Sequence, residues 1–182
     1  AITGLAKDQF AAFAPTAMGG FTADHFEAID HNYMAALGKD HVAAFAPMAV
    51  AGFDDRHIAA FDEQAIAGFK ADHVAALNLG AITGLAKDQF AALDPTAMGG
   101  FTADNFEAID HSFMTALGKE HVAEFDPTVV AGFDEKHIAA FDPTAMAGFG
   151  KDQVAAFDPT AMAGFKADHV AAFDTTAITG LA

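Results

Sequence analysis

Histidine recurs along this 182-residue chain at multiples of sixteen residues, often directly after an aspartate. Imidazole and carboxylate groups are good ligands for Zn²⁺ and other divalent ions. The row therefore predicts either a metal-binding ladder or polar first-turn residues that face solvent or a neighbouring coil. The Asp-His pairs are Asp24-His25, Asp40-His41, Asp72-His73 and Asp168-His169. We favour the second interpretation because Gln or Asn replaces His at equivalent positions, namely Gln9, Gln89, Asn105 and Gln153.

Two further histidines lie outside this row, in units that break the repeat pattern. Ile29-Asp-His-Asn-Tyr33 and Ile109-Asp-His-Ser-Phe113 are related segments of the two halves of the chain, and both place an aromatic residue where other units have Ala. Either the core is locally wider at these units, or they make a lateral contact between copies. The residues of the predicted lateral contact are His31, Tyr33, His111 and Phe113.

Residues suited to catalysis are scarce. The chain has no Cys, Ser112 is its only Ser, and Arg56 is its only Arg. Catalysis requires a nucleophile, a base and charge-stabilising donors at one place, whereas the acids here are spread evenly. We expect no enzymatic activity, no small-molecule substrate and no cofactor beyond weakly bound Ca²⁺ or Zn²⁺.

Two apolar rows must position these residues, and they make the chain a tandem repeat. Every eighth residue from Leu5 to Leu181 is Phe, Leu or Ile, and a second unbroken row runs three residues ahead, from Ile2 to Ile178. Because 18 of the 19 Phe lie on these rows, we assign them to a continuous core. The predicted core phenylalanines are Phe13, Phe21, Phe45, Phe53, Phe61, Phe69, Phe101, Phe125, Phe133, Phe141, Phe149, Phe157, Phe165 and Phe173.

The eight-residue period excludes long regular elements. A continuous α-helix turns about 100° per residue, so successive octads would drift about 80° apart and no apolar stripe would form. Strand residues three apart point to opposite faces, whereas helical residues three apart share a face. The sequence therefore predicts one short helix per octad.

Capping signals mark the helix ends. Asp followed by Pro places an acceptor at the N-cap and Pro at the first helical position, in Asp94-Pro95, Asp126-Pro127, Asp142-Pro143 and Asp158-Pro159. A late Gly in the same type of octad predicts a left-handed residue that closes the last turn, at Gly52, Gly68, Gly84, Gly132, Gly148 and Gly164. These signals leave about five to seven residues for each helix.

Octads of two types alternate, one with Pro-Thr-Ala and a late Gly, the other with Asp-His or Asp-Gln and a late Ala. Isolated helices this short are unstable, so we predict an all-α solenoid with two short helices per 16-residue coil. Residues 1–80 realign with 81–160 at 57 of 80 positions, which defines an 80-residue superrepeat. We expect one continuous solenoid over 1–182, ending in a partial superrepeat 161–182.

The chain opens and closes with the same residues, Ala-Ile-Thr-Gly-Leu. This predicts either an excerpt of a longer repetitive protein or units that stack end to end. The formal charge of −16 repels nucleic acid, and there is no apolar run long enough to span a membrane. We therefore expect the protein to associate with itself.

Two tracts resemble a known repeat pattern. Leu5-Ala-Lys-Asp-Gln-Phe-Ala-Ala-Phe13 and Phe21-Thr-Ala-Asp-His-Phe-Glu-Ala-Ile29 are similar to the Leu-Thr-x-x-Gln-apolar-x-x-Leu octads in low-complexity regions of large secreted or surface bacterial proteins. The similarity covers the whole chain, with Phe for most of the Leu and His for much of the Gln. It implies an extended extracellular or cell-surface segment.

We thus expect a structural repeat protein that forms a rod, a filament or a surface stalk. Two other functions are compatible with the composition. One is an acidic cation-binding repeat protein for Ca²⁺ or Zn²⁺, and the other is a scaffold for a basic partner.

Overall fold

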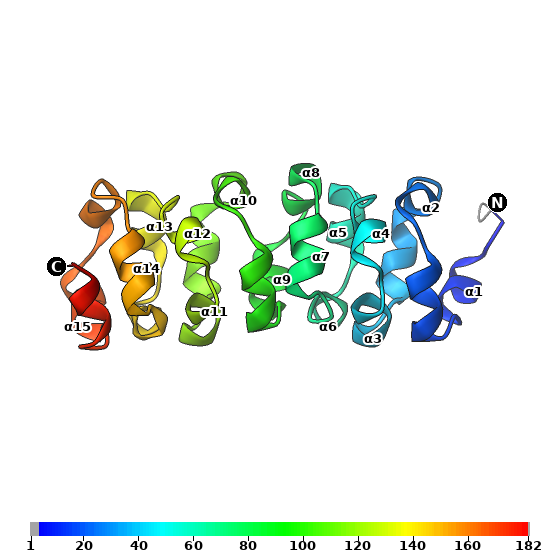
Figure 1. Ribbon diagram of the computed structural model, residues 1–182. Helices are drawn as coiled ribbons and strands as arrows, with labels where there is room; N and C mark the ends of the chain where they lie inside the picture. Colours follow the sequence, from blue (N-terminus) through cyan, green and yellow to red (C-terminus); the bar gives the residue numbers. More distant parts are fainter. Residues whose placement is uncertain (1–3, 182) are drawn as a thin grey trace. The chain divides into compact units, whose positions relative to one another are not determined.

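The computed structural model describes residues 4–181 and contains only short helices in that range, without a strand (Figure 1). This confirms the predicted class, an all-helical solenoid with one short helix per octad. The contacts group into two compact units, residues up to Gly100 and residues from Phe101 onward. That the whole chain is one continuous solenoid stays a prediction.

Each unit is a series of helices in sequence order. The first unit contains α1 (Lys7–Ala11), η1 (Pro15–Gly20), α2 (Ala23–Glu27), η2 (His31–Ala36), α3 (Lys39–Ala43), α4 (Pro47–Val50), α5 (Asp55–Ala60), α6 (Glu63–Ile66), α7 (Ala71–Ala76), α8 (Leu79–Ile82), α9 (Lys87–Ala92) and η3 (Pro95–Gly100), where η denotes a 3₁₀ helix. The second unit contains α10 (Ala103–Ala108), η4 (His111–Ala116), α11 (Lys119–Ala123), α12 (Pro127–Val130), α13 (Glu135–Ala140), η5 (Pro143–Gly148), α14 (Lys151–Ala156), η6 (Ala161–Gly164), α15 (Ala167–Ala172) and η7 (Ala177–Leu181).

The two octad types form different helices. We call the octads that begin at residue 6 and at every sixteenth residue thereafter ladder octads; each forms an α-helix. The octads between them, which we call cap octads, form 3₁₀ helices or single α-helical turns. Capping follows the sequence prediction, since Asp126 and Asp142 accept the backbone N–H groups of Thr128 and Thr144 at 2.8 and 2.9 Å.

Helices three octads apart in the sequence pack against each other. In the first unit α4 packs on α7 and α6 on α9, and in the second unit α11 packs on η5. A coil therefore closes after three octads, and the expected coil of two octads is wrong. Because three is odd, every such pair joins a ladder octad to a cap octad. The alternation of octad types therefore specifies complementary contact surfaces and not the coil length.

The late glycines have a different role from the one expected. No Gly among residues 4–181 has a positive φ, so none of them closes a helix in the left-handed conformation. Instead, each lies against the first residue of the ladder helix three octads earlier. A Cβ at Gly52 would lie 2.5 Å from the carbonyl oxygen of Ala23, and one at Gly132 would lie 2.6 Å from the Cβ of Ala103. These positions require Gly because the chain approaches a neighbouring helix closely there.

Both apolar rows point into the interior of each unit except in the last helices, where Met162, Val170 and Leu181 are exposed. Eleven of the fourteen predicted core phenylalanines are buried; Phe13, Phe165 and Phe173 are partly exposed. Buried rings meet mostly edge-on, as Phe26 and Phe53 do with centroids 4.6 Å apart, an arrangement that stabilises aromatic pairs. Within the described residues, no helix is both long enough and apolar enough to cross a bilayer.

Candidate functional site

The ladder position is the third residue of each ladder helix, and its His or Gln side chain joins two coils, as it does for His41, His73, Gln89, Gln153 and His169. His73 Nδ1 accepts the backbone N–H of Lys70, which precedes α7, at 3.2 Å. His73 Nε2 lies 2.9 Å from the carbonyl oxygen of Phe45 in the previous coil. A carbonyl only accepts, so the ring carries its proton on Nε2 and bonds backbone groups at both ends. His41 and His169 make the same two contacts.

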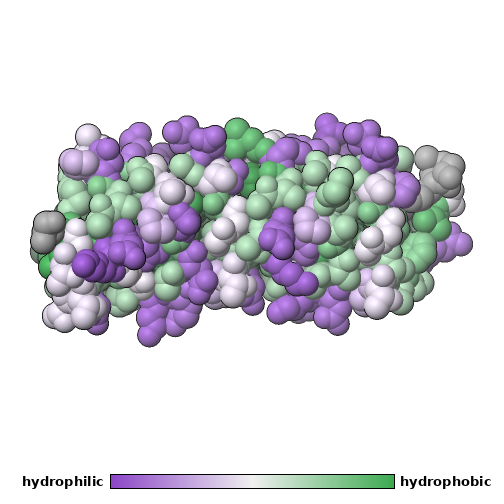
Figure 2. All heavy atoms as spheres, in the orientation of Figure 1, coloured by the Kyte–Doolittle hydropathy of each residue, from purple (hydrophilic) through white to green (hydrophobic). Residues whose placement is uncertain are grey.

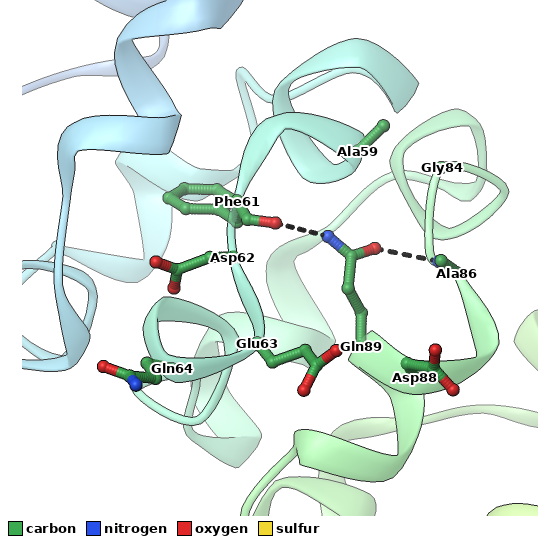
Figure 3. Close-up of a pocket in the computed structure, with 9 residues that line it drawn as sticks. All are labelled: Ala59, Phe61, Asp62, Glu63, Gln64, Gly84, Ala86, Asp88 and Gln89. Atoms are coloured by element: carbon green, nitrogen blue, oxygen red, sulfur yellow. Dashed lines mark hydrogen bonds between the residues drawn. The ribbon is translucent and has the colours of Figure 1, made fainter.

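Glutamine makes equivalent bonds at the ladder position, as Figure 3 shows for Gln89. Its Oε1 accepts the N–H of Ala86 at 2.8 Å, and its Nε2 donates to the carbonyl oxygens of Ile58 and Phe61 at 2.9 and 2.8 Å. A neutral imidazole and a primary amide both present an acceptor at one side and a donor at the other. This shared pattern explains why His and Gln interchange along the row.

These bonds agree with the second interpretation at three of the four Asp-His pairs. The aspartates of the four pairs are exposed, and both ring nitrogens of His41, His73 and His169 contact backbone groups. No group of three potential metal ligands forms around these pairs in the described part of the chain. The histidines of these three pairs thus lie against neighbouring coils, and a metal-binding ladder stays a prediction.

Two ladder positions differ from the others because an Asp precedes their helix. Asp54 Oδ1 accepts the N–H groups of Arg56 and His57 at 3.1 and 3.0 Å and lies 2.7 Å from His57 Nδ1. Asp54 Oδ2 lies 3.2 Å from His31 Nε2. The Nε2 atom of His57 lies 3.1 Å from the carbonyl oxygen of Phe26. A carboxylate and two imidazoles thus meet at the junction of η2 and α5.

The second unit repeats this cluster. His111 Nε2 lies 3.4 Å from Asp134 Oδ2, and His137 Nδ1 lies 2.8 Å from Asp134 Oδ1. His137 Nε2 lies 3.2 Å from the carbonyl oxygen of Phe106. In both clusters the candidate ligand atoms all lie within 4.8 Å of one another. We call the two groups the His-Asp-His clusters.

Each cluster combines two partly exposed side chains with one buried histidine. The side chains of His31 and Asp54 are 33% and 49% exposed, whereas that of His57 is 3% exposed. Burial disfavours ionisation of Asp54, but the backbone hydrogen bond from His57 and the neighbouring imidazoles outweigh it and lower the pKa to about 2. Burial lowers the pKa of His57, and the Asp54 carboxylate opposes this shift. Asp54 is therefore an anion at neutral pH.

Sequence reasoning missed the clusters, although a signal was present. Asp occupies the residue before a ladder helix only at Asp54 and Asp134, three residues before a ladder His. His31 and His111, the two histidines outside the ladder, precede these aspartates by the same interval in the two halves of the chain. His31 contacts Asp54, and His111 contacts Asp134, because a coil contains three octads. The sequence predicted a coil of two octads, in which these residues would not meet.

The units that carry His31 and His111 were expected to touch another copy or to widen the core. The Tyr33 hydroxyl donates to the Leu5 carbonyl oxygen at 2.7 Å, and its partly buried ring lies 5.8 Å from that of Phe10. Phe113 is likewise partly buried. These contacts lie within one chain and agree with a locally wider core; a lateral contact between copies stays a prediction.

The surface hollows bring together few reactive groups. One of about 560 Å³ is rimmed by the carboxylates of Asp62, Glu63 and Asp88, beside the fully hydrogen-bonded amide of Gln89 (Figure 3). Another, of about 260 Å³, is apolar and lined by Phe165, Phe173 and their neighbours in the last helices. On the face drawn in Figure 2, hydrophilic residues are dispersed among weakly apolar ones.

The fold and these contacts define the protein's class: a short-helix repeat solenoid whose coils are linked by buried His and Gln side chains. No protein-family model matches the chain, and no curated protein matches its sequence significantly.

Proposed function

We propose that the protein is a structural repeat module whose copies stack end to end into a rod or filament. The extracellular or cell-surface location implied by the bacterial resemblance belongs to this proposal. Its main support is a difference in exposure between equivalent residues. Ile66, Val74 and Leu85 are 0%, 2% and 8% exposed, whereas their counterparts in the last helices, Met162, Val170 and Leu181, are 37%, 52% and 51% exposed.

The helices that bury Ile66, Val74 and Leu85 indicate what kind of surface could bury Met162, Val170 and Leu181. α9 packs on α6, and η3 packs on α7. Residues 157–172, which contain η6 and α15, match residues 61–76, which contain α6 and α7, at 13 of 16 positions. Residues 7–20, which form α1 and η1, match residues 87–100, which form α9 and η3, at 12 of 14 positions. A further repeat of the same kind, or a second copy through its α1 and η1, therefore offers almost the same surface that covers α6 and α7.

Apolar burial supplies the driving force for this stacking. Covering Met162, Val170 and Leu181 removes three large side chains from water, each worth on the order of 1.5–3 kcal/mol when fully buried. The ladder supports a structural role as well, since its His and Gln side chains hydrogen bond the backbone between coils.

Association of the purified chain tests the proposal. We expect sedimentation velocity to detect concentration-dependent oligomers and negative-stain microscopy to show rods of varying length. Val170→Asp places a charge on the exposed end of α15 and should leave a monomer with an unchanged far-UV circular dichroism spectrum. Leu79→Asp is the matched control, because Leu79 is 48% exposed in α8, which belongs to neither proposed contact surface, and it should associate like the parent. A parent chain that stays monomeric at all concentrations would overturn the proposal.

A further inference from the structure

Each His-Asp-His cluster contains an unusual contact. His57 Nε2 faces the Phe26 carbonyl oxygen, an acceptor, and so carries a proton. The other nitrogen, Nδ1, faces the N–H of Asp54 at 3.2 Å but also Asp54 Oδ1 at 2.7 Å. A nitrogen lone pair and a carboxylate oxygen this close repel each other unless a proton or a metal ion lies between them. At His73, whose helix has no preceding Asp, Nδ1 faces the backbone N–H of Lys70.

The third member of the cluster adds a further donor to the same place. His31 Nε2 approaches Asp54 Oδ2 at 3.2 Å, and the two imidazole rings lie 4.4 Å apart between centroids. Protons alone would satisfy these contacts if His57 carried a proton on each nitrogen and a neutral His31 donated from Nε2 to Asp54 Oδ2. One metal ion would instead engage both rings and the carboxylate together. The second unit reproduces the arrangement, with His111 and His137 4.3 Å apart.

We propose that His31, Asp54 and His57, and separately His111, Asp134 and His137, each bind one divalent transition-metal ion of the Zn²⁺ class. Two nitrogen ligands and one carboxylate oxygen suit Zn²⁺, whereas Ca²⁺ requires six to eight oxygen ligands. With Zn–ligand bonds of about 2.0–2.1 Å, tetrahedral ligands lie about 3.3 Å apart. The distances from His31 to Asp54 and from His111 to Asp134 are 3.2 and 3.4 Å. His57 Nδ1 and His137 Nδ1 lie 2.7 and 2.8 Å from the nearer carboxylate oxygen, Oδ1, so an ion shared with them would engage the other oxygen, Oδ2.

The surroundings of the ligands match those of known metal sites. Metal-binding His usually donates its second N–H to a carbonyl or carboxylate, which fixes the ring orientation. His57 and His137 face the carbonyl oxygens of Phe26 and Phe106 in this way. Asp54 and Asp134 are held by two backbone N–H groups each. Three protein ligands leave a fourth position open to water at the exposed side of the cluster.

Metal stoichiometry of the full chain tests the proposal. After treatment with a chelator, equilibrium dialysis against Zn²⁺ should give two ions per chain. His31→Ala should reduce this number to one, and His31→Ala with His111→Ala should weaken binding at both sites at least 100-fold. Both side chains are partly exposed, so circular dichroism should report an unchanged fold. Co²⁺ should give the visible spectrum of a tetrahedral site in the parent and lose it in the double variant.

A ladder histidine outside the two clusters provides the matched control. His73→Gln keeps the backbone bonds that Gln89 makes and should leave two Zn²⁺ ions per chain. Two ions that persist in the double variant, or a loss caused by His73→Gln, would overturn the assignment. The absence of Zn²⁺ binding at micromolar concentrations would show that protons alone balance the clusters, and Ca²⁺ binding at the same residues would contradict the metal class. Val170→Asp should bind Zn²⁺ normally, which separates this test from the test of end-to-end stacking.

Discussion

A single hydrogen-bonding pattern explains the buried polar residues of both units. The ladder side chain accepts from the residue before its own helix, and the buried His and Gln also donate to the previous coil, because an imidazole and an amide both have the required donor and acceptor atoms. Each buried polar side chain in the described residues has a partner, since no unsatisfied one occurs there. This matters because an unpaired buried polar group costs about 1–3 kcal/mol.

Acid should destabilise the protein through the ladder residue His73. Burial lowers the pKa of His73, the nearby Lys70 charge acts in the same direction, and the Phe45 carbonyl and Asp72 oppose them. Below its ordinary pKa of 6.5 the unfolded state therefore binds more protons than the folded state, and stability falls as the pH falls. One histidine contributes at most about 1.4 kcal/mol per pH unit.

Replacing this histidine by Gln should weaken the acid dependence. His73→Gln keeps both backbone bonds without a titrating group, so its free energy of unfolding in urea should fall less between pH 7.5 and pH 5. Gln89→His is the reverse control and should make the dependence steeper. Equal slopes in the parent and both variants would show that these positions do not titrate differently on folding.

At the scale of the element, the two octad types are complementary parts of one contact. A cap octad supplies the late Gly, and a ladder octad supplies the helix start that approaches it, as Gly148 and Lys119 do. The three-octad coil brings opposite types together everywhere in each unit. The number of octads between two helices is therefore as important as the residues in them.

Deleting one octad should damage the second unit more than deleting two. Removing residues 142–149 places ladder octads on ladder octads, so that Ala156 replaces Gly148 against Lys119. Overpacking of this kind typically costs about 1–3 kcal/mol at each site. Removing residues 142–157 keeps the alternation and should preserve a cooperative, though less stable, fold. Chemical denaturation would measure both effects, and a more stable single-octad deletion would contradict the three-octad coil.

At the scale of the whole molecule, net charge opposes the proposed stacking. Two copies of charge −16 repel each other, and salt screens this repulsion: the Debye length falls from about 30 Å at about 0.01 M to about 8 Å at about 0.15 M. Association of the parent should therefore strengthen with NaCl, as measured by sedimentation, while Val170→Asp stays monomeric. Oligomers that dissociate as salt rises would point to an ionic interface instead of an apolar one.

The sequence by itself determined the helical class, the helix spacing, the caps and the apolar rows. These are local properties: positions three apart share a helical face, Asp caps the turn that follows it, and neither depends on what packs nearby. The same locality explains why the buried Phe133 and Phe149 could be assigned from their positions alone.

Only the tertiary structure decided which octads touch. The two octad types alternate along the sequence, and nothing local distinguishes stacking after two octads from stacking after three. That choice gave the late glycines a packing role instead of a left-handed one. It also brought His31 to Asp54 and His111 to Asp134, because contacts between coils depend on how the chain closes around its core.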